Sequence, residues 1–145
     1  MYSMTNANLS PDIIVGRNEH HQLLLLALAN AEQDPANTAD WLLSELDRAM
    51  IVADQAVPPN TVRMQSLVRF RTGDGTERTV KLVYPGDADI ADGRVSALTP
   101  VGAALIGLRE RQSITYRTRD GRKQVLTVLQ VVNGPDDDVL GALAA

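Results

Sequence analysis

Apolar residues recur at helical spacing in the first third of the chain. Leucine and alanine dominate residues 18–30, and the polar, proline-containing stretch 34–37 then breaks any helix. A second helix is predicted from Thr38, which suits the N-cap position, to about Asp54, because apolar residues return there at i, i+3, i+4 and i+7. A proline pair at 58 and 59 ends it. The pattern predicts a short antiparallel helical hairpin, or coiled coil, whose second helix is about 25 Å long.

Beyond the hairpin, apolar and polar residues alternate with the period of β-strands. Strands are predicted over residues 62–71, 76–84, 95–98, 113–118 and 123–132, and a short extended segment over 12–15. Glycine-containing turns at 72–75 and 120–121 join two pairs of strands into hairpins. In the first of these strands the apolar face consists of Val62, Met64, Val68 and Phe70.

One short helix is predicted between the strands. Thr99 suits its N-cap, Pro100 its first position and Gly107 the residue after its end. Residues 101–106 are small or apolar, so this helix can lie close to the concave face of a sheet. The order of elements therefore predicts an α+β fold, in which an N-terminal helical hairpin precedes strands around one short helix.

Composition narrows the classes of function. The chain has 145 residues, of which 44% are hydrophobic and 22% charged, as in an ordinary globular protein. It has no cysteine, which excludes disulfides, thiolate catalysis and zinc ribbons. Aromatic-walled pockets and base-stacking platforms are disfavoured, because aromatic residues are few. They are Tyr2, Trp41, Phe70, Tyr84 and Tyr116.

The beginning of the chain shows no targeting signal. Its first 20 residues lack the basic start, apolar stretch and cleavage site of a signal peptide. The longest apolar run, residues 23–29, is too short to span a bilayer. We therefore expect a cytoplasmic protein without a membrane partner.

Charge divides the chain into three parts. Residues 1–57 carry two basic and eight acidic residues, a net charge of −6, whereas residues 58–133 carry twelve basic and seven acidic residues, a net charge of +5. Residues 134–145 add three aspartates. We expect an N-terminal hairpin part, a C-terminal domain and an acidic flexible tail with these bounds.

Familiar catalytic and metal-binding motifs are incomplete in this sequence. Gly102 and Gly107 have P-loop spacing, but the following Leu108 and Arg109 stand where Lys and Ser or Thr are required. Residues 87–93 resemble a calcium loop without the bidentate Glu. Adjacent helical residues such as His20 and His21 cannot chelate one metal, and we expect both on the surface. No metal site, cofactor or catalytic triad is predicted.

Two charged groups are candidates for function. Glu32, Asp34 and Asp40 gather near the hairpin tip, where carboxylates could hold magnesium, although exposed helix ends are commonly acidic. Basic residues in the C-terminal part could bind a nucleic-acid backbone or an acidic protein surface. The scarcity of aromatic residues favours the acidic protein surface. These residues are Arg63, Arg69, Arg71, Arg109, Arg111, Arg117, Arg119, Arg122 and Lys123.

Three segments carry a family resemblance. Residues 43–49 (LSELDRA), 82–85 (LVYP) and 95–108 (VSALTPVGAALIGL) resemble the regulators of nucleoside diphosphate kinase, over a match that runs from residue 11 to about 133. Through that family the chain is similar to the bacterial transcript-cleavage factors GreA and GreB. The resemblance implies an FKBP-like C-terminal domain after a coiled coil, and an RNA polymerase partner at the secondary channel.

The resemblance also implies a docking segment and a tip. The Gre docking motif, Asp or Asn followed by Ser-Pro, matches Leu98, Thr99 and Pro100, so that a polar contact at Leu98 is lost. We expect polymerase contacts from Leu98, Thr99, Pro100, Val101, Gly102 and Arg109. The tip carboxylates of Gre factors have no clear counterpart, and the predicted hairpin is too short to bring Glu32 or Asp34 to the polymerase active centre.

Three functional hypotheses follow. The favoured one is a non-enzymatic transcription regulator that competes with Gre factors for polymerase without stimulating RNA cleavage, and that affects the level of nucleoside diphosphate kinase. It needs no cofactor and no sequence-specific nucleic acid. The alternatives are a general interaction or dimerisation module built on the leucine-rich hairpin, and a transcript-cleavage stimulator that uses Glu32, Asp34 or Asp40.

Overall fold

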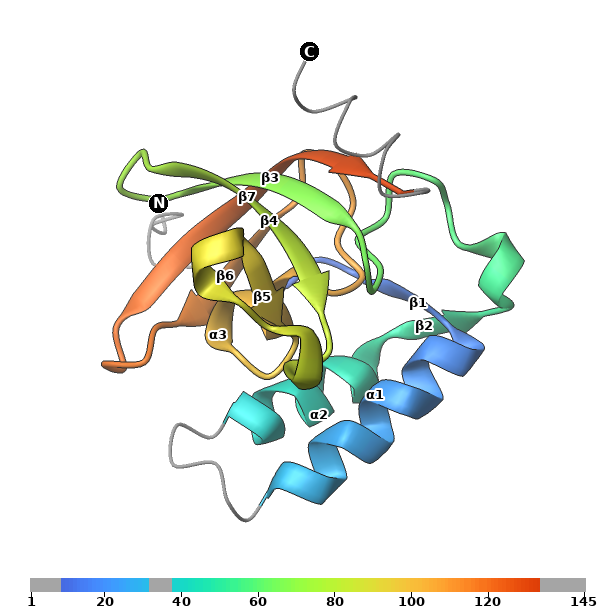
Figure 1. The fold of residues 1–145 in the computed structure, drawn as a ribbon. Helices are drawn as coiled ribbons and strands as arrows, with labels where there is room; N and C mark the ends of the chain where they lie inside the picture. Colours follow the sequence, from blue (N-terminus) through green and yellow to red (C-terminus); the bar gives the residue numbers. More distant parts are fainter. Residues whose placement is uncertain (1–8, 32–37, 134–145) are drawn as a thin grey trace, which may run out of the picture.

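The computed structural model describes residues 9–31 and 38–133 (Figure 1). Glu32, Asp34 and the acidic tail lie outside these residues. The chain forms a helical hairpin on a small two-stranded sheet, followed by a curled five-stranded sheet with one short helix. The predicted α+β fold with an N-terminal hairpin is confirmed. None of the helices in the described part is long and apolar enough to cross a membrane.

The hairpin consists of α1 (Arg17–Asn30) and α2 (Thr38–Arg48), enclosed by β1 (Ile14–Gly16) and β2 (Met50–Val52). The prediction that the second helix continues to Asp54 is wrong. After Arg48 the chain extends, because Met50–Val52 pairs in parallel with β1 and the Met50 N–H donates to the Ile13 carbonyl at 2.9 Å. Ile51 and Val52 are β-branched, which favours this extended backbone. A 3₁₀ turn, η3 (Asp54–Ala56), follows.

Asp54 caps the start of α1 from a distance. Its Oδ1 accepts a hydrogen bond from the Asn18 N–H at 3.1 Å, while Gly16, the N-cap residue itself, has no side chain to do so. A Cβ at Gly16 would lie 2.3 Å from the same oxygen, which explains the glycine at this position. The two ends of the hairpin are therefore locked together by the ladder and by this cap.

The larger sheet has the strand order β5-β4-β3-β7-β6. All neighbours are antiparallel except β4 and β5, and β3 bulges between Arg69 and Phe70 where it pairs with β7. The strands are β3 (Leu67–Thr72), β4 (Glu77–Val83), β5 (Arg94–Ser96), β6 (Ser113–Arg117) and β7 (Lys123–Val132). Two 3₁₀ turns, η4 (Pro85–Asp87) and η5 (Ile90–Asp92), lie between β4 and β5.

The first strand of this sheet is shorter than predicted. Residues 63–66 form a turn in which Gln65 takes a positive φ of 73° and the Ser66 N–H donates to the Arg63 carbonyl at 3.0 Å, so that β3 begins only at Leu67. The burial of Val62, Met64, Val68 and Phe70 nevertheless agrees with the predicted apolar face.

The short helix, α3 (Pro100–Leu105), is capped at both ends as predicted. Thr99 Oγ1 accepts a hydrogen bond from the Gly102 N–H at 3.1 Å, and Gly107 follows the helix with a φ of 79°. A Cβ at Gly102 would lie 2.0 Å from the Ser96 carbonyl oxygen, so the small residues do allow a close approach.

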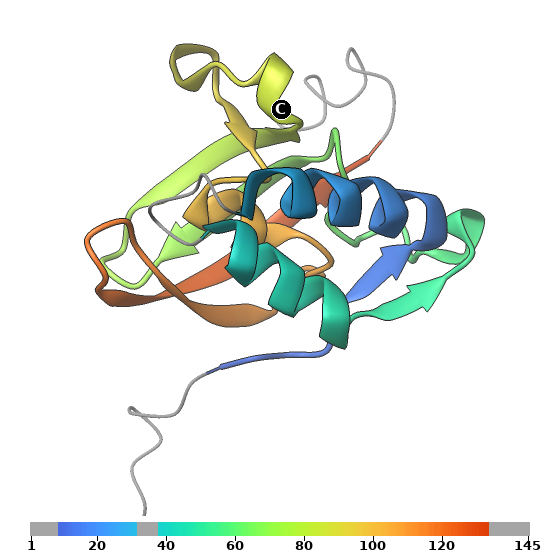
Figure 2. The same cartoon turned by 90° about the horizontal axis from the view of Figure 1, so that it is seen from below.

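One hydrophobic core joins the hairpin to the sheet. Leu23 of α1 and Leu42 of α2 are fully buried in the same cluster as Phe70 and Leu82 of the sheet. Figures 1 and 2 show α1 and α2 side by side along one side of the sheet, with α3 between α2 and the strands. The Ile14 N–H also donates to the Gly107 carbonyl at 3.2 Å. The division into two domains at residue 57 stays a prediction.

Candidate functional site

The expected docking residues divide into two groups in space. Leu98, Thr99, Pro100 and Val101 lie together at the start of α3, and all four are half-buried. Arg109 follows the other end of α3, where it forms a β-bridge with Thr61. The structure therefore brings together the residues that match the family motif and leaves Arg109 apart from them.

Hydrogen bonds hold the start of α3 firmly. The Thr99 hydroxyl accepts from the Gly102 N–H and donates to the Ser96 carbonyl at 2.7 Å. The Leu98 N–H donates to Ser96 Oγ at 3.0 Å, and the Leu98 side chain packs against the core. Gly102 is buried, so its contribution is the close packing of α3 on Ser96. This segment is a rigid surface feature rather than a loose loop.

A hollow of about 280 Å³ opens beside this segment. It lies between the start of α3, the turns after β4, and β6. Its apolar wall includes Val101 and Ile90, and the Ile90 side chain is 81% exposed. The residues that line it are Arg78, Ala88, Ile90, Arg94, Val95, Ser96, Thr99, Pro100, Val101, Tyr116, Thr118 and Arg119.

A second hollow of about 510 Å³ lies on the other side of Pro100. It separates α2 from the β6–β7 hairpin, and its lining includes Trp41, Tyr116 and Arg119. Arg119 belongs to the basic residues that the sequence indicated, but Trp41 and Tyr116 were missed as site candidates, because the lining comes from elements far apart in the chain. The remaining lining residues are Thr38, Asp40, Ser44, Pro100, Arg117, Thr118 and Gly121.

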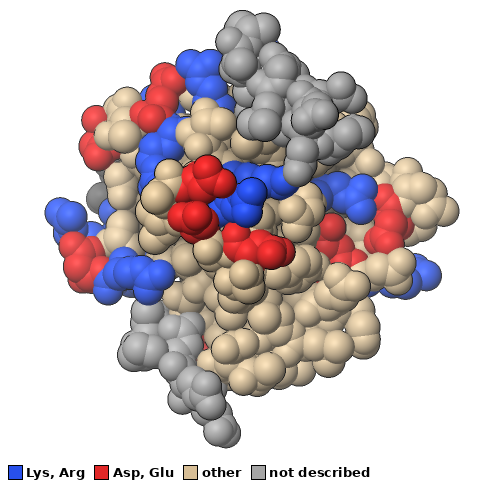
Figure 3. Space-filling model, in the orientation of Figure 1, with Lys and Arg blue, Asp and Glu red and all other residues tan. Residues whose placement is uncertain are grey.

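The basic residues of the C-terminal part are not one uncompensated patch. Arg69 lies 2.7 Å and Arg71 3.9 Å from the Glu77 carboxylate. Figure 3 accordingly shows acidic side chains among the basic ones. Arg122 is paired with Asp120 at 2.9 Å. Within residues 9–31 and 38–133, Arg119 forms no ion pair, and it lines both hollows.

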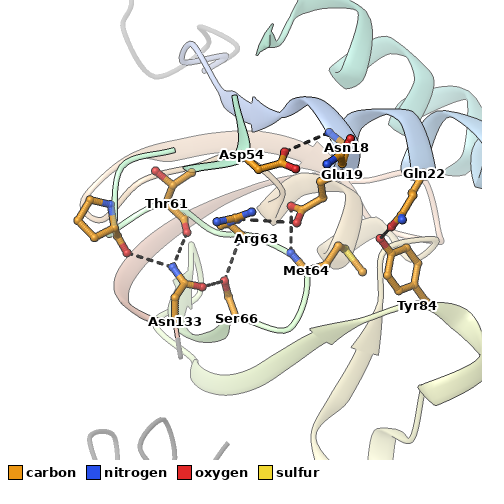
Figure 4. A network of polar contacts seen from close by, with 11 residues as sticks. Asn18, Glu19, Gln22, Asp54, Thr61, Arg63, Met64, Ser66, Tyr84 and Asn133 are labelled. Atoms are coloured by element: carbon orange, nitrogen blue, oxygen red, sulfur yellow. Dashed lines mark hydrogen bonds and ion pairs between the residues drawn. The ribbon is translucent and has the colours of Figure 1, made fainter. Parts of the chain in front are cut away.

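A polar network joins α1 to the turn before β3 (Figure 4). Glu19 Oε1 accepts from the Met64 N–H at 3.1 Å, and its Oε2 lies 3.8 Å from Arg63 Nε. The Glu19 side chain is only 13% exposed, and this burial raises the pKa of its carboxyl, an effect that the bond from Met64 and the charge of Arg63 only partly oppose. Tyr84 Oη donates to Gln22 Oε1 at 2.8 Å on the same side of α1.

The same network continues to the end of the sheet. Asn133 Nδ2 donates to the carbonyls of Pro59 and Thr61, each at 3.0 Å, and its Oδ1 accepts from the Ser66 hydroxyl. Ser66 Oγ in turn accepts from the Arg63 N–H at 2.7 Å. These contacts connect the linker at residues 59–66 to both β7 and α1, and so fix the helical hairpin against the sheet.

The acidic candidates at the hairpin tip gain no support from geometry. Asp40 is exposed in the first turn of α2, while Glu32 and Asp34 lie outside the described residues. No group of three or more His, Asp or Glu residues that could hold a metal ion occurs within the described ranges. The expectation of two surface histidines is half wrong, because His20 is half-buried and its Nε2 lies 2.9 Å from the Leu46 carbonyl oxygen.

The outer face of α1 is apolar. Leu25 is 54% and Leu28 56% exposed, and residues 20–31 contain no Asp, Glu, Lys or Arg. In Figure 3 the lower surface, over α1, is almost free of charged side chains. A helix with apolar residues on both sides is suited to a partner on its outer face.

Comparison with known proteins supports a common origin for this arrangement. The family model described as "Transcription elongation factor, GreA/GreB, C-term" matches residues 57–133. A "Regulator of nucleoside diphosphate kinase" from Escherichia coli (strain K12) is 39% identical over 99 residues, which cover 68% of this chain and 73% of that protein.

Gre factors themselves are similar over a smaller part. "Transcription elongation factor GreA" from Chloroflexus aurantiacus is 38% identical over 87 residues, 59% of this chain and 55% of that protein, so the match spans about half of the GreA chain. A solved structure, "Prokaryotic transcription elongation factor GreA/GreB from Nitrosomonas europaea", superposes with a TM-score of 0.65 at 32% identity, over 84% of this chain and 100% of that one.

Proposed function

We propose that this chain, which belongs to the GreA/GreB family that includes the regulators of nucleoside diphosphate kinase, is a transcription regulator. It binds bacterial RNA polymerase near the secondary channel. The observation that carries the proposal is the rigid start of α3, which corresponds to the family's docking motif with a departure at Leu98 and lies beside a hollow. The C-terminal domain docks there, and the hairpin occupies the channel mouth.

The hairpin is too short to act as a cleavage factor. Its helices have 14 and 11 residues, which gives arms of about 21 Å and about 17 Å at 1.5 Å per residue. The polar network around Glu19 also prevents the hairpin from swinging away from the sheet to extend its reach. The protein therefore acts by occupancy, without enzymatic activity, and competes with GreA and GreB. A change in nucleoside diphosphate kinase level is the consequence of altered transcription.

The test is direct binding to core RNA polymerase by biolayer interferometry, with GreA or GreB as competitor. The dock is probed with Val101→Asp, which places a charge in the hollow at a helical position where Asp is well tolerated. Ile51→Asp is the control, because it places the same charge on an exposed apolar residue of β2 that does not line the hollow. We expect Val101→Asp to weaken binding at least about tenfold and Ile51→Asp to leave it unchanged.

Three results would contradict this proposal. Saturable binding that neither GreA nor GreB displaces would show that the contact lies away from the secondary channel. Equal affinities for Val101→Asp and the wild type, both folded by circular dichroism, would show that the start of α3 does not bind polymerase. Magnesium-dependent shortening of RNA in a backtracked complex would show that the protein stimulates cleavage after all.

The apolar outer face of α1 favours a second candidate function, a dimerisation or interaction module. Leu25 and Leu28 are three residues apart and both exposed, as an interhelical contact requires. Light scattering tests self-pairing. A dimer that Leu28→Asp converts to a monomer supports this candidate. A monomer throughout the micromolar range refutes self-pairing and leaves a different protein as the partner.

A further inference from the structure

We infer that the two hollows beside Pro100 form one groove with two lobes, and that this groove binds an acidic polypeptide segment that also carries apolar side chains. The inference rests on the proposed function, because it assigns the chemistry of the polymerase segment that docks here. It extends the dock beyond the family motif to α2, which supplies Trp41, and to the β6–β7 hairpin, which supplies Arg119.

Shared residues make the two lobes continuous. Pro100, Tyr116, Thr118 and Arg119 line both hollows, so α3 begins at the ridge between them. One lobe, of about 280 Å³, ends at the turns that hold Ile90, and the other, of about 510 Å³, ends at α2. Each volume is that of a small-ligand site or just below it, and the pair suits an extended segment of several residues.

The charges along the groove fit an acidic occupant. Four arginines line it, Arg78, Arg94, Arg117 and Arg119, against one carboxylate, Asp40. Arg94 lies 3.4 Å from Asp92, and Arg117 Nη1 donates to the Gly121 carbonyl at 2.9 Å. Arg78 and Arg119 form no ion pair with any residue in the described ranges; Arg78 lies over the Phe70 ring, 5.9 Å from its centroid. Two guanidinium groups are thus left for carboxylates of a partner.

The apolar walls favour a polypeptide over a nucleic acid. Ile90 is 81% exposed at one end, and Val101 and Trp41 are partly exposed along the groove. Single-stranded nucleic acid needs several exposed aromatic faces for stacking, but Tyr116 is only 4% exposed, which leaves Trp41 as the one accessible ring among the lining residues. Aliphatic anchors beside carboxylates are what these walls accommodate.

Trp41 gives the groove its own reporter, because it is the only tryptophan of the chain. The experiment titrates the full chain with a blocked peptide of alternating Glu and Leu residues and follows Trp41 fluorescence. Its analogue with Gln for Glu and a single-stranded RNA oligonucleotide are the comparison probes. We expect a saturable change with the Glu peptide that weakens with salt, and at least about tenfold weaker binding of the Gln analogue.

Two charge reversals on the same hairpin locate the binding. Arg119→Glu removes a cation of both lobes, whereas Arg122→Glu removes one that lines neither and is paired with Asp120. We expect Arg119→Glu to abolish the fluorescence change and Arg122→Glu to preserve it, with both variants folded by circular dichroism. Equal losses in the two variants, or tighter binding of the RNA than of the Glu peptide, would overturn the inference.

Polymerase binding by the same two variants separates this inference from the proposed function. If the wild type binds polymerase and Arg119→Glu binds equally well, the groove is not the dock and the inference fails while the proposed function stands. If the peptide binds through Arg119 but polymerase is not bound at all, the proposed function fails and the groove serves another acidic partner.

Discussion

Gly107 is the position where a single methyl group tests the packing of the N-terminal segment on the short helix. It follows α3 with a φ of 79°, and a Cβ added there would lie 2.8 Å from Ile13 Cβ and 3.2 Å from the Ile14 carbonyl oxygen. Ile13 is fully buried. The substitution Gly107→Ala therefore meets two obstacles, one of backbone conformation and one of space.

The size of each obstacle can be worked out separately. A non-glycine residue in the left-handed region costs about 1–2 kcal/mol. Displacing the closely packed Ile13 segment adds about 1–3 kcal/mol, as for other cases of overpacking. We expect Gly107→Ala to lower the free energy of unfolding by about 2–5 kcal/mol, a large part of the total of about 5–15 kcal/mol for a domain.

Gly121 is the matched control. It has a φ of 85°, and a Cβ added there would meet nothing within 4 Å. Gly121→Ala therefore retains the conformational cost of about 1–2 kcal/mol without the steric one. Urea unfolding followed by circular dichroism gives both values. Equal losses for Gly107→Ala and Gly121→Ala would refute the close contact between the N-terminal segment and the end of α3.

Further predictions concern the contact of Glu19 with the turn before β3, and the N-terminal caps of α1 and α3. Burial raises the pKa of Glu19 above its ordinary value of 4.5, so the folded state holds this proton more tightly than the unfolded state, and ionisation lowers stability as pH rises above 4.5. In urea titrations, the free energy of unfolding of Glu19→Gln relative to wild type should increase over that pH range; a constant difference contradicts the burial. Asp54→Ala should lower the free energy of unfolding by about 1 kcal/mol, since the Asn18 N–H loses its acceptor, and Asp54→Asn should lower it less. Thr99→Val should cost about 1–2 kcal/mol in thermal unfolding and Thr99→Ser about none, because only the serine keeps the cap to Gly102.

Local patterns in the sequence were sufficient for much of the fold. The β-hairpins and the caps of α3 depend on neighbouring residues, such as Asp120–Gly121 and Thr99–Pro100, so their sequence signals are complete in themselves. The end of α2 was predicted wrongly because Met50 and Ala53 continue the helical spacing. What ends the helix is the pairing of Met50–Val52 with Ile14–Gly16, a contact between distant segments that no local pattern reveals.

The candidate site was only partly visible in the sequence. The family motif at Leu98–Pro100 indicated the start of α3, which does border a hollow. The groove as a whole is assembled from α2, the turns after β4, α3 and the β6–β7 hairpin. Trp41 and Arg119 lie 78 positions apart in the chain, and neither belongs to a motif. Only the folded chain brings them to one surface.

The two-stranded ladder of β1 and β2 has a consequence for how the hairpin can change in length. It holds the entry to α1 and the exit from α2 on adjacent strands, about 4.8 Å apart. Insertions of equal size in both helices leave these two anchor points where they are. Seven residues added to each arm would move the tip outward by about 10 Å without disturbing the sheet or the core beneath it. The length of the hairpin can therefore change, in evolution or by design, independently of the five-stranded sheet.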